Sequence, residues 1–179
     1  MTIVDDQSVV PEVIIDRCFK GVFDNFRSID ETTAKCLIRL KCPLVLNRVI
    51  RISNAVSGVL ARHQGELHLN GLRTLSDAAA QELSRHRAYL SLDGLTEISD
   101  DGAQSLSRHQ AELSLTGLKT LSNYAAKCFS RHETVVLLLG LKEISAEAAA
   151  FLRTNRNALF FQPSKSTKPL VTTSKTVLH

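Results

Sequence analysis

The chain has 179 residues, of which 44% are hydrophobic and only 5% aromatic, and it contains no tryptophan. This length fits one domain with a real core, which must be built from small aliphatic residues in thin layers. The net charge of +4 is unevenly spread, with 6 Lys and Arg against 7 Asp and Glu in residues 1–43, 13 against 11 in residues 44–161, and 3 against none in residues 162–179. Because the surplus lies mostly at the C-terminus, the sequence shows no concentrated phosphate-binding footprint, and nucleic acid is not an expected partner.

The sequence also predicts neither a protein held by disulfides or a cysteine-bound metal nor a secreted or membrane protein. The cysteines form no CxxC pair and no metal-ligand spacing, which indicates reduced structural thiols: Cys18, Cys36, Cys42 and Cys128. The N-terminal residues MTIVDDQSVV contain no basic region followed by an apolar stretch, and the sequence has no run of 18 apolar residues. We therefore expect no secretion signal and no membrane span, and we expect a cytoplasmic protein.

Three segments follow one another along the chain. In residues 1–20, the stretch from Pro11 to Cys18 fits a helix, and we expect this segment to be a capping helix or partial repeat. From about Gly21 to Phe161 the sequence consists of repeats. Residues 162–179 are rich in Ser, Thr, Lys and Pro and are expected to form a flexible tail.

A strict 23-residue period runs through the middle segment. It places Gly-Leu at 71–72, 94–95, 117–118 and 140–141, and Arg-His at 62–63, 85–86, 108–109 and 131–132. Four units match the pattern L-x-L-x-G-L-x-x-(L/I)-S-x-x-A-A-x-x-L-S-R-H-x-x-x closely, and two degenerate units precede them, which gives about six units. A fixed period of this length is typical of a stacked repeat architecture.

Each unit combines two hydrophobic periods. Leu67 and Leu69 alternate with polar residues, as in a half-buried strand. Ala79, Ala80 and Leu83 then share one face of a helix. A residue suited to cap the helix N-terminus precedes this face in every unit: Asp30, Ser53, Ser76, Ser99, Ser122 and Ser145. Each unit is therefore predicted to be a strand, a turn and a short helix.

Neither half of a unit can bury its apolar side alone, so the units must stack into an α/β solenoid with a parallel sheet on one side and helices on the other. Strands pack roughly 4.8 Å apart, whereas helices need about 8 to 10 Å. We therefore expect a curved parallel sheet on the concave side and short helices on the convex side. Small residues at the helix contact keep this curvature moderate: Ala79, Gly102, Ala125 and Ala148.

This repeat resembles the leucine-rich-repeat family, particularly its bacterial and ribonuclease-inhibitor-like types, in which L-x-L leads into a helix carrying S-x-x-G-A-x-x-L. Residues 98–106, ISDDGAQSL, are the nearest match. The resemblance implies a fold and no chemistry. It also shows a departure, because the family's asparagine after L-x-L is replaced by leucine at 72, 95, 118 and 141. Backbone groups in this turn must find other partners, and the preceding glycine indicates a tight bend that a residue without Cβ enters cheaply.

The repeated histidines His63, His86, His109 and His132 invite comparison with a metal site. One copy per unit keeps neighbouring rings several Å apart, whereas the ligands of one zinc ion must converge at about 2.0 to 2.1 Å from it. We expect a structural ladder in which each ring bonds the backbone of the next unit. At the matching position the last unit has Asn155 and the first has Leu40.

The arginines that precede these histidines are expected to point into solvent, where they favour the helix C-termini: Arg62, Arg85, Arg108 and Arg131. A stripe that binds polyanions is the alternative interpretation. No nucleophile-base pair, glycine-rich phosphate loop or carboxylate pair stands out from the repeat. We expect no enzymatic activity, no cofactor and no metal.

A binding function should lie on the outward strand residues, which have no structural duty in this interpretation and vary from unit to unit. The candidate partner-binding residues are Glu66, His68, Asn70, Tyr89, Ser91, Asp93, Glu112, Ser114, Thr116, Leu137, Leu139 and Phe160. The middle of this surface is small and polar, with Tyr89 as its aromatic anchor. It becomes apolar toward the C-terminus, where residues 135–139 break the alternation and Phe160 follows on the next unit.

An apolar strand surface should be covered by something. The tail of this chain is one candidate cover, and a partner protein or a homodimer is the other. The leading hypothesis is a non-catalytic module that binds a protein through the concave strand face. The alternatives are a polyanion or nucleic-acid binder that uses the Arg-His helix edge and the basic tail, and a structural or effector fragment.

Overall fold

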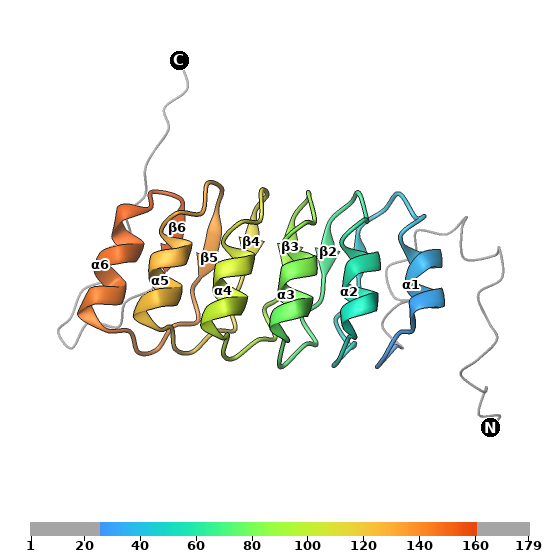
Figure 1. Ribbon diagram of the computed structural model, residues 1–179, viewed down its shortest axis with the longest axis horizontal. Helices are drawn as coiled ribbons and strands as arrows, with labels where there is room; N and C mark the ends of the chain where they lie inside the picture. Colours follow the sequence, from blue (N-terminus) through green and yellow to red (C-terminus); the bar gives the residue numbers. More distant parts are fainter. Residues whose placement is uncertain (1–25, 161–179) are drawn as a thin grey trace, which may run out of the picture.

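The computed structural model describes residues 26–160, which form a repeat solenoid in which six helices alternate with six strands. The helices lie side by side in one row, and the strands lie behind them in the same order (Figure 1). The elements are α1 (Glu31–Leu37), β1 (Leu44–Val45), α2 (Asn54–Leu60), β2 (Leu67–His68), α3 (Asp77–Leu83), β3 (Leu90–Ser91), α4 (Asp100–Leu106), β4 (Leu113–Ser114), α5 (Asn123–Phe129), β5 (Val136–Leu138), α6 (Ala146–Thr154) and β6 (Ala158–Phe160). The capping helix expected in residues 1–20 and the tail expected in residues 162–179 lie outside the described residues.

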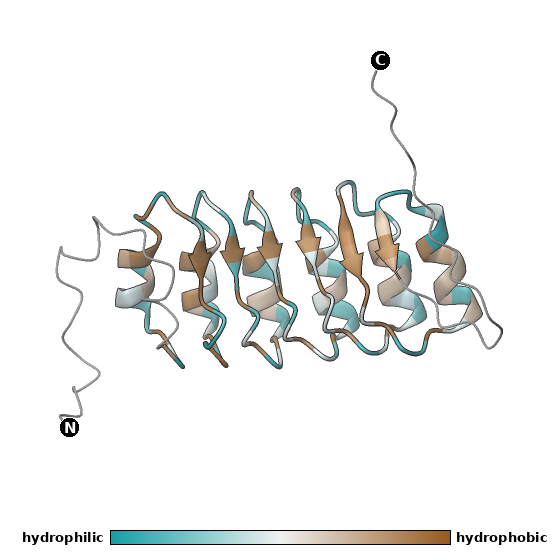
Figure 2. Ribbon diagram, turned by 180° about the vertical axis from the view of Figure 1, so that it is seen from behind, coloured by the Kyte–Doolittle hydropathy of each residue, from teal (hydrophilic) through white to brown (hydrophobic). Residues whose placement is uncertain are grey.

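All six strands belong to one parallel sheet in the order β1-β2-β3-β4-β5-β6. Leu67 pairs with Leu90 and Leu90 pairs with Leu113, so the register follows the 23-residue period. Figure 2 shows this sheet from its outer side, with the helices behind it. The predicted α/β solenoid with a parallel sheet is confirmed, although each strand has only two or three residues. The predicted curvature toward the strands stays a prediction.

Every helix begins directly after the cap residue that the sequence indicates. The cap side chain accepts a hydrogen bond from the backbone N–H three residues later, as in Thr33 N to Asp30 Oδ1 at 2.7 Å. The caps also join neighbouring coils, because the Ser99 hydroxyl donates to Asp77 at the start of the preceding helix. The same link recurs at Ser76, Ser122 and Ser145. Among residues 26–160 no helix is long and apolar enough to cross a membrane.

The core fills the space between the helix row and the sheet, and it repeats one aliphatic layer. Leu67, Leu69 and Leu72 are fully buried, and the same three positions are buried in the following coils. The helices contact one another through small residues, and Ala79 and Ala125 are buried as predicted. Full burial of one leucine is worth roughly 1.5 to 3 kcal/mol. The fold is therefore stabilised by many equal layers and not by a few large anchors.

The glycines of the Gly-Leu pairs are required by the close approach of neighbouring coils. A Cβ atom on Gly94 would lie 2.1 Å from Asn70 O, and one on Gly117 would lie 2.0 Å from Asp93 O. Neither glycine has a left-handed backbone conformation. The sequence was right to single out these positions, but the reason is space between coils and not a strained bend.

The last coil departs from the 23-residue register by one residue. In β6, Ala158 pairs with Val136, Leu159 with Leu137 and Phe160 with Leu138. Because side chains alternate along a strand, this shift reverses which residues face inward. Phe160 therefore packs against the core, and Leu159 is 44% exposed. The prediction that placed Phe160 on the outer surface is wrong, because the step from the last buried helix residue to the strand is one residue shorter here, from Leu152 to Ala158, than from Phe129 to Val136 in the coil before.

Candidate functional site

The strand face, as we use the term, is the outer surface of the sheet together with the residue that follows each strand. Ser91 and Ser114 occupy its centre, but both are only 1% exposed. Their hydroxyls are held by neighbouring coils, since Ser91 Oγ donates to Asn70 Oδ1 at 2.6 Å and Ser114 Oγ donates to Asp93 Oδ1 at 2.6 Å. The expectation that both serines contact a partner is therefore corrected. They form a tightly packed floor.

Beside this floor runs a polar row at the carboxyl ends of the strands, which we call the Asn/Asp row: Asn47, Asn70 and Asp93. Each side chain accepts a hydrogen bond from the backbone N–H of the equivalent residue one coil later. The distances from donor nitrogen to acceptor oxygen are 3.2, 3.0 and 2.8 Å. These side chains therefore accept hydrogen bonds from backbone groups of the turn, which the family's asparagine, replaced here by leucine, does not bond.

The Asn/Asp row also contradicts the idea that outward strand residues have no structural duty. Sequence reasoning missed it, although the signal was present. A polar residue stands immediately before Gly71, Gly94 and Gly117, at the same 23-residue spacing as the leucines. A buried backbone N–H needs an acceptor, and a polar side chain beside the tight contact between coils can supply one.

Asp93 is the most heavily bonded member of the row. Its carboxylate accepts from Ser114 Oγ and Thr116 N, and its Oδ2 lies 2.9 Å from Ser91 Oγ, whose single proton it shares with Asn70 Oδ1. Burial acts to raise the pKa of Asp93, but these hydrogen bonds stabilise the carboxylate and bring its net pKa below the ordinary value. Asp93 is therefore an ionised, positioned residue and not a free surface charge.

The N-terminal part of the strand face presents an aromatic and acidic cluster. The rings of His68 and Tyr89 are 5.3 Å apart between centroids and tilted by 57°. His68 Nε2 lies 3.3 Å from Glu66 Oε2. Tyr89 is half-buried, which gives it a fixed position while part of its ring remains accessible. Glu112, one coil further, is exposed and adds a second carboxylate to this surface.

The C-terminal part of the strand face is apolar. Leu139 is 52% exposed and Leu159 is 44% exposed, while Leu137 between them is half-buried. We call these three residues the leucine patch. Leu137 and Leu139 agree with the prediction of an apolar C-terminal surface, and Leu159 replaces Phe160 in it. The tail that was expected to cover this surface lies outside the described residues.

The four histidines form a second row between coils, which we call the histidine row: His63, His86, His109 and His132. Their rings are stacked nearly parallel with centroids 6.4, 6.0 and 6.5 Å apart. All four residues are only 1 to 2% exposed. The short bonds from the rings to backbone carbonyls reach the preceding coil, from His109 Nε2 to Ala88 O at 3.1 Å and from His132 Nδ1 to Ser107 O at 3.1 Å, while His132 Nε2 lies 3.0 Å from Thr134 Oγ1 of its own coil. The predicted structural row is correct, but its bonds run to the preceding coil and not to the next.

Burial dominates the protonation of the histidine row. It lowers the pKa of His63, of His86 and, most strongly, of His109, whose pKa falls to about 4. The neighbouring rings of His86 and His132 lower the pKa of His109 further, because two adjacent imidazolium ions repel each other. Among residues 26–160 no group of three or more His, Cys, Asp and Glu side chains is arranged to hold a metal ion. Asn155 closes the row as predicted, donating from Nδ2 to the carbonyls of Phe129 and His132.

No protein-family model, curated protein or solved structure matches the chain. The fold therefore rests on the repeat and the structure themselves, which show a parallel α/β repeat solenoid.

Proposed function

We propose that this chain is a leucine-rich-repeat protein that binds a protein partner through its strand face and catalyses no reaction. The leucine patch supports this most directly. Leu139 and Leu159 expose about half of their surface, whereas most leucines among residues 26–160 are buried. Apolar surface that is gathered on one face of a folded unit marks a site that another surface covers.

The chemistry of the strand face indicates what kind of side chains its partner would carry. Besides the leucine patch, the face carries Glu66, Glu112 and the ionised Asp93. The corresponding outward positions from Pro43 to Leu159 contain no Lys or Arg. We therefore expect a partner that inserts apolar side chains at the leucine patch and brings basic groups to the N-terminal coils. Tyr89 lies among these acidic residues, beside His68, and is suited to be an aromatic anchor.

A capture experiment with matched variants tests the proposal. The full-length chain is immobilised and exposed to a native lysate, as wild type, as Leu139→Asp, as Tyr89→Ala and as the control Ile50→Asp. Ile50 is 49% exposed, close to the 52% of Leu139, but it lies in the turn after β1 and not on the strand face. The control therefore introduces the same charge at the same exposure elsewhere.

We expect a specific captured protein to be lost with Leu139→Asp, reduced with Tyr89→Ala and retained with Ile50→Asp. Circular dichroism and melting temperatures establish that all four proteins are folded. Equal capture by folded wild type and Leu139→Asp would contradict the proposal. Light scattering on the same samples detects a homodimer, and a dimer that dissociates in Leu139→Asp would show that the partner is a second copy of the chain.

A further inference from the structure

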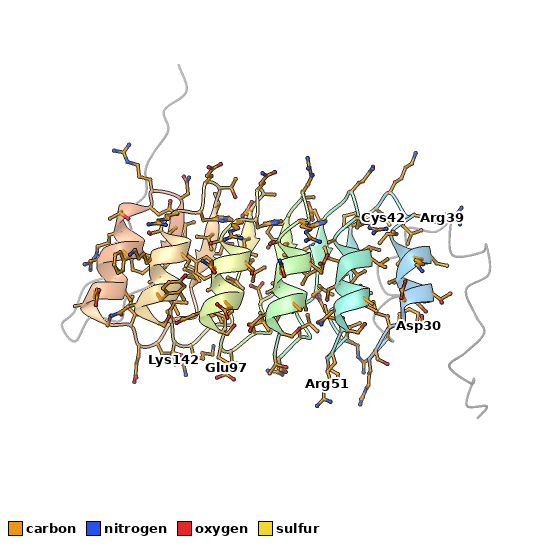
Figure 3. All side chains as sticks on the ribbon, viewed as in Figure 1. Asp30, Arg39, Cys42, Arg51, Glu97 and Lys142 are labelled. Carbon is orange, nitrogen blue, oxygen red and sulfur yellow. The ribbon has the colours of Figure 1, made fainter. Side chains whose placement is uncertain are left out.

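The fold sorts charge onto two edges of the stack. The basic edge, as we define it, consists of the loops from each helix to the next strand together with the last two residues of α6, which are residues 38–43, 61–66, 84–89, 107–112, 130–135 and 153–157. These loops hold nine Arg and Lys residues against three Glu residues. The opposite edge consists of Asp30, Glu31 and residues 46–54, 69–77, 92–101, 115–124 and 138–147, and it holds five Arg and Lys residues against nine Asp and Glu residues. In Figure 3, Arg39 marks the basic edge, and Arg51, Glu97 and Lys142 mark the opposite one.

A groove lies where the basic edge meets α4 and α5. It has a volume of about 460 Å³, and Arg108, Lys127 and Arg131 line it together with a single carboxylate, that of Glu133. The side chains of these three cations make no hydrogen bond or ion pair within residues 26–160. Arg85, by contrast, is paired with Glu82 at 2.6 Å. Three positive charges thus line one groove and none of them is paired by a hydrogen bond or ion pair within residues 26–160.

The Cys128 thiol on the groove wall lies within electrostatic reach of two of these cations. Burial raises the pKa of the Cys128 thiol on the groove wall, and both Arg108 and Arg131 act against this by favouring the thiolate. The two guanidinium groups come from successive coils, yet both influence the same sulfur atom. A second groove of about 540 Å³ lies along the same edge between α2 and α3, lined by Arg62, Arg85 and Arg87.

Helix electrostatics explains why single basic residues stand at this edge. The C-terminal end of a helix carries partial negative charge, which a nearby cation offsets by about 0.3 to 1 kcal/mol. This effect accounts for one arginine per coil. Arg108 and Arg131 are each the one such arginine of their coil, but Lys127 from the last turn of α5 adds a third cation to the same groove, where the charges repel each other.

We propose that the basic edge binds the sugar-phosphate backbone of a nucleic acid, and that Arg108, Lys127 and Arg131 contact its phosphates. Eight of the nine cations on this edge are arginines, whose planar forks match phosphate oxygens. Their recurrence in successive coils suits a polymer with evenly spaced charges. An acidic protein fits less well, because protein interfaces are anchored by apolar and aromatic residues, and Tyr124 is the one aromatic residue that lines the two grooves.

Counting charge by segment made nucleic acid an unexpected partner, and a polyanion-binding stripe of arginines remained only the alternative interpretation. Read along the chain, the coils differ in charge, since residues 90–112 hold one Arg against five Asp and Glu, whereas residues 44–66 hold three Arg against one Glu. Stacking brings the basic residues that follow the helices into one row and places most acidic residues of 26–160 on the opposite edge. The binding surface is created by stacking and is absent from any single coil.

Fluorescence anisotropy with labelled single-stranded and duplex oligonucleotides tests the proposal. The full-length chain is compared with Arg108→Ala/Lys127→Ala/Arg131→Ala and with the control Arg48→Ala/Arg51→Ala/Arg73→Ala on the opposite edge. Both variants remove three exposed cations and keep the three lysines of residues 162–179. Polyglutamate of equal charge serves as the competing acidic polypeptide, and melting temperatures show whether each variant is folded.

We expect the basic-edge variant to lose roughly tenfold in affinity at about 0.1 M salt, and its slope of log K against log salt to fall by about 2 to 3. The control should change by less than half of this. Absence of binding by the wild type, equal losses in the two variants, or tighter binding of polyglutamate than of oligonucleotide would each overturn the proposal. Tyr89→Ala and Leu139→Asp should leave oligonucleotide binding unchanged, which separates this result from the fate of the strand-face proposal.

Discussion

The histidine row and the Asn/Asp row repeat with the same period at opposite ends of the strands, but they hold the coils together in different ways. Asn70 and Asp93 accept hydrogen bonds from backbone N–H groups of the next coil. In the histidine row, both ring nitrogens of His63 and of His86 are buried without a short hydrogen bond to another described residue. The Asn/Asp row bonds the backbone, whereas His63 and His86 fill space with stacked rings whose pKa values are lowered by burial.

This difference shows that recurrence alone does not reveal what a residue does. Both rows recur because the scaffold uses them, yet their energetics are opposite. The Asn/Asp row gains stability from ionised or polar groups that are well bonded. The histidine row requires its groups to remain uncharged, because a buried charge without a partner is costly. The two rows should therefore respond differently to substitution and to pH.

The largest effect is expected where the coils approach most closely, at the glycine beside the Asn/Asp row. Gly94→Ala would place a Cβ 2.1 Å from Asn70 O, which is backbone and cannot yield. We expect a loss of about 3 kcal/mol or more in the free energy of unfolding, measured by urea denaturation. Gly58→Ala is the control. Gly58 lies inside α2, and its added Cβ would meet only the flexible side-chain end of Glu82 in α3. That variant should be neutral or slightly stabilised; if both variants behave alike, the close-approach argument fails.

Acid should break the histidine row first. The pKa of His109 is about 4 in the folded chain and ordinarily 6.5, so between these values the unfolded chain binds more protons. Stability is therefore fully present above pH 6.5 and is lost as the pH falls toward 4, by about 3 kcal/mol for this group. His63 and His86, whose pKa values are also lowered, add to the loss.

Melting temperatures between pH 7 and pH 4 measure this loss. His109→Asn provides the comparison, because asparagine already stands at the equivalent position 155 and cannot be protonated. We expect the pH dependence of this variant to be flatter than that of the wild type. Asp93, whose pKa is below its ordinary value, titrates under this window and should not interfere. A wild type whose stability is constant from pH 7 to pH 4 would refute the neutral-ring interpretation.

The smallest of the three effects concerns the Asn/Asp row itself. Asp93→Ala removes the acceptor for Thr116 N and for the Ser91 and Ser114 hydroxyls, and we expect a loss of about 2 kcal/mol. Asp93→Asn keeps an oxygen acceptor, as Asn70 does one coil earlier, and should lose less than half as much. Hydrogen exchange at the Thr116 amide reports the same contact. Equal losses in the two variants would show that the charge, and not the backbone bond, is what matters.

Much of the fold followed from the sequence because each coil repeats the same local rules. The caps, the strand and helix order, the buried small residues of the helix row and the parallel register were all predicted from the 23-residue period. The register of the last coil was not predicted. The segment that leads from the buried part of α6 into β6 is one residue shorter than in the other coils, and the sequence does not reveal this because apolar residues occupy both the expected and the shifted positions. That single residue exchanged Phe160 for Leu159 on the outer surface.

The candidate sites depended more on tertiary structure. The apolar end of the strand face was predicted, since residues 135–139 visibly break the alternation. The burial of Ser91 and Ser114 was not, because exposure in a sheet is set by the neighbouring strands, which the sequence of one coil does not contain. The convergence of Arg108, Lys127 and Arg131 in one groove likewise involves two coils.

The sequence by itself determined what one coil is: where its strand and helix lie, which residue caps the helix and which leucines face inward. These features depend on residues within about one turn or one strand of each other. Tertiary structure decided what the coils do to each other, including which polar groups bond between coils, which histidines are kept neutral and which charges share an edge. Those properties arise only when equivalent residues 23 positions apart become neighbours in space.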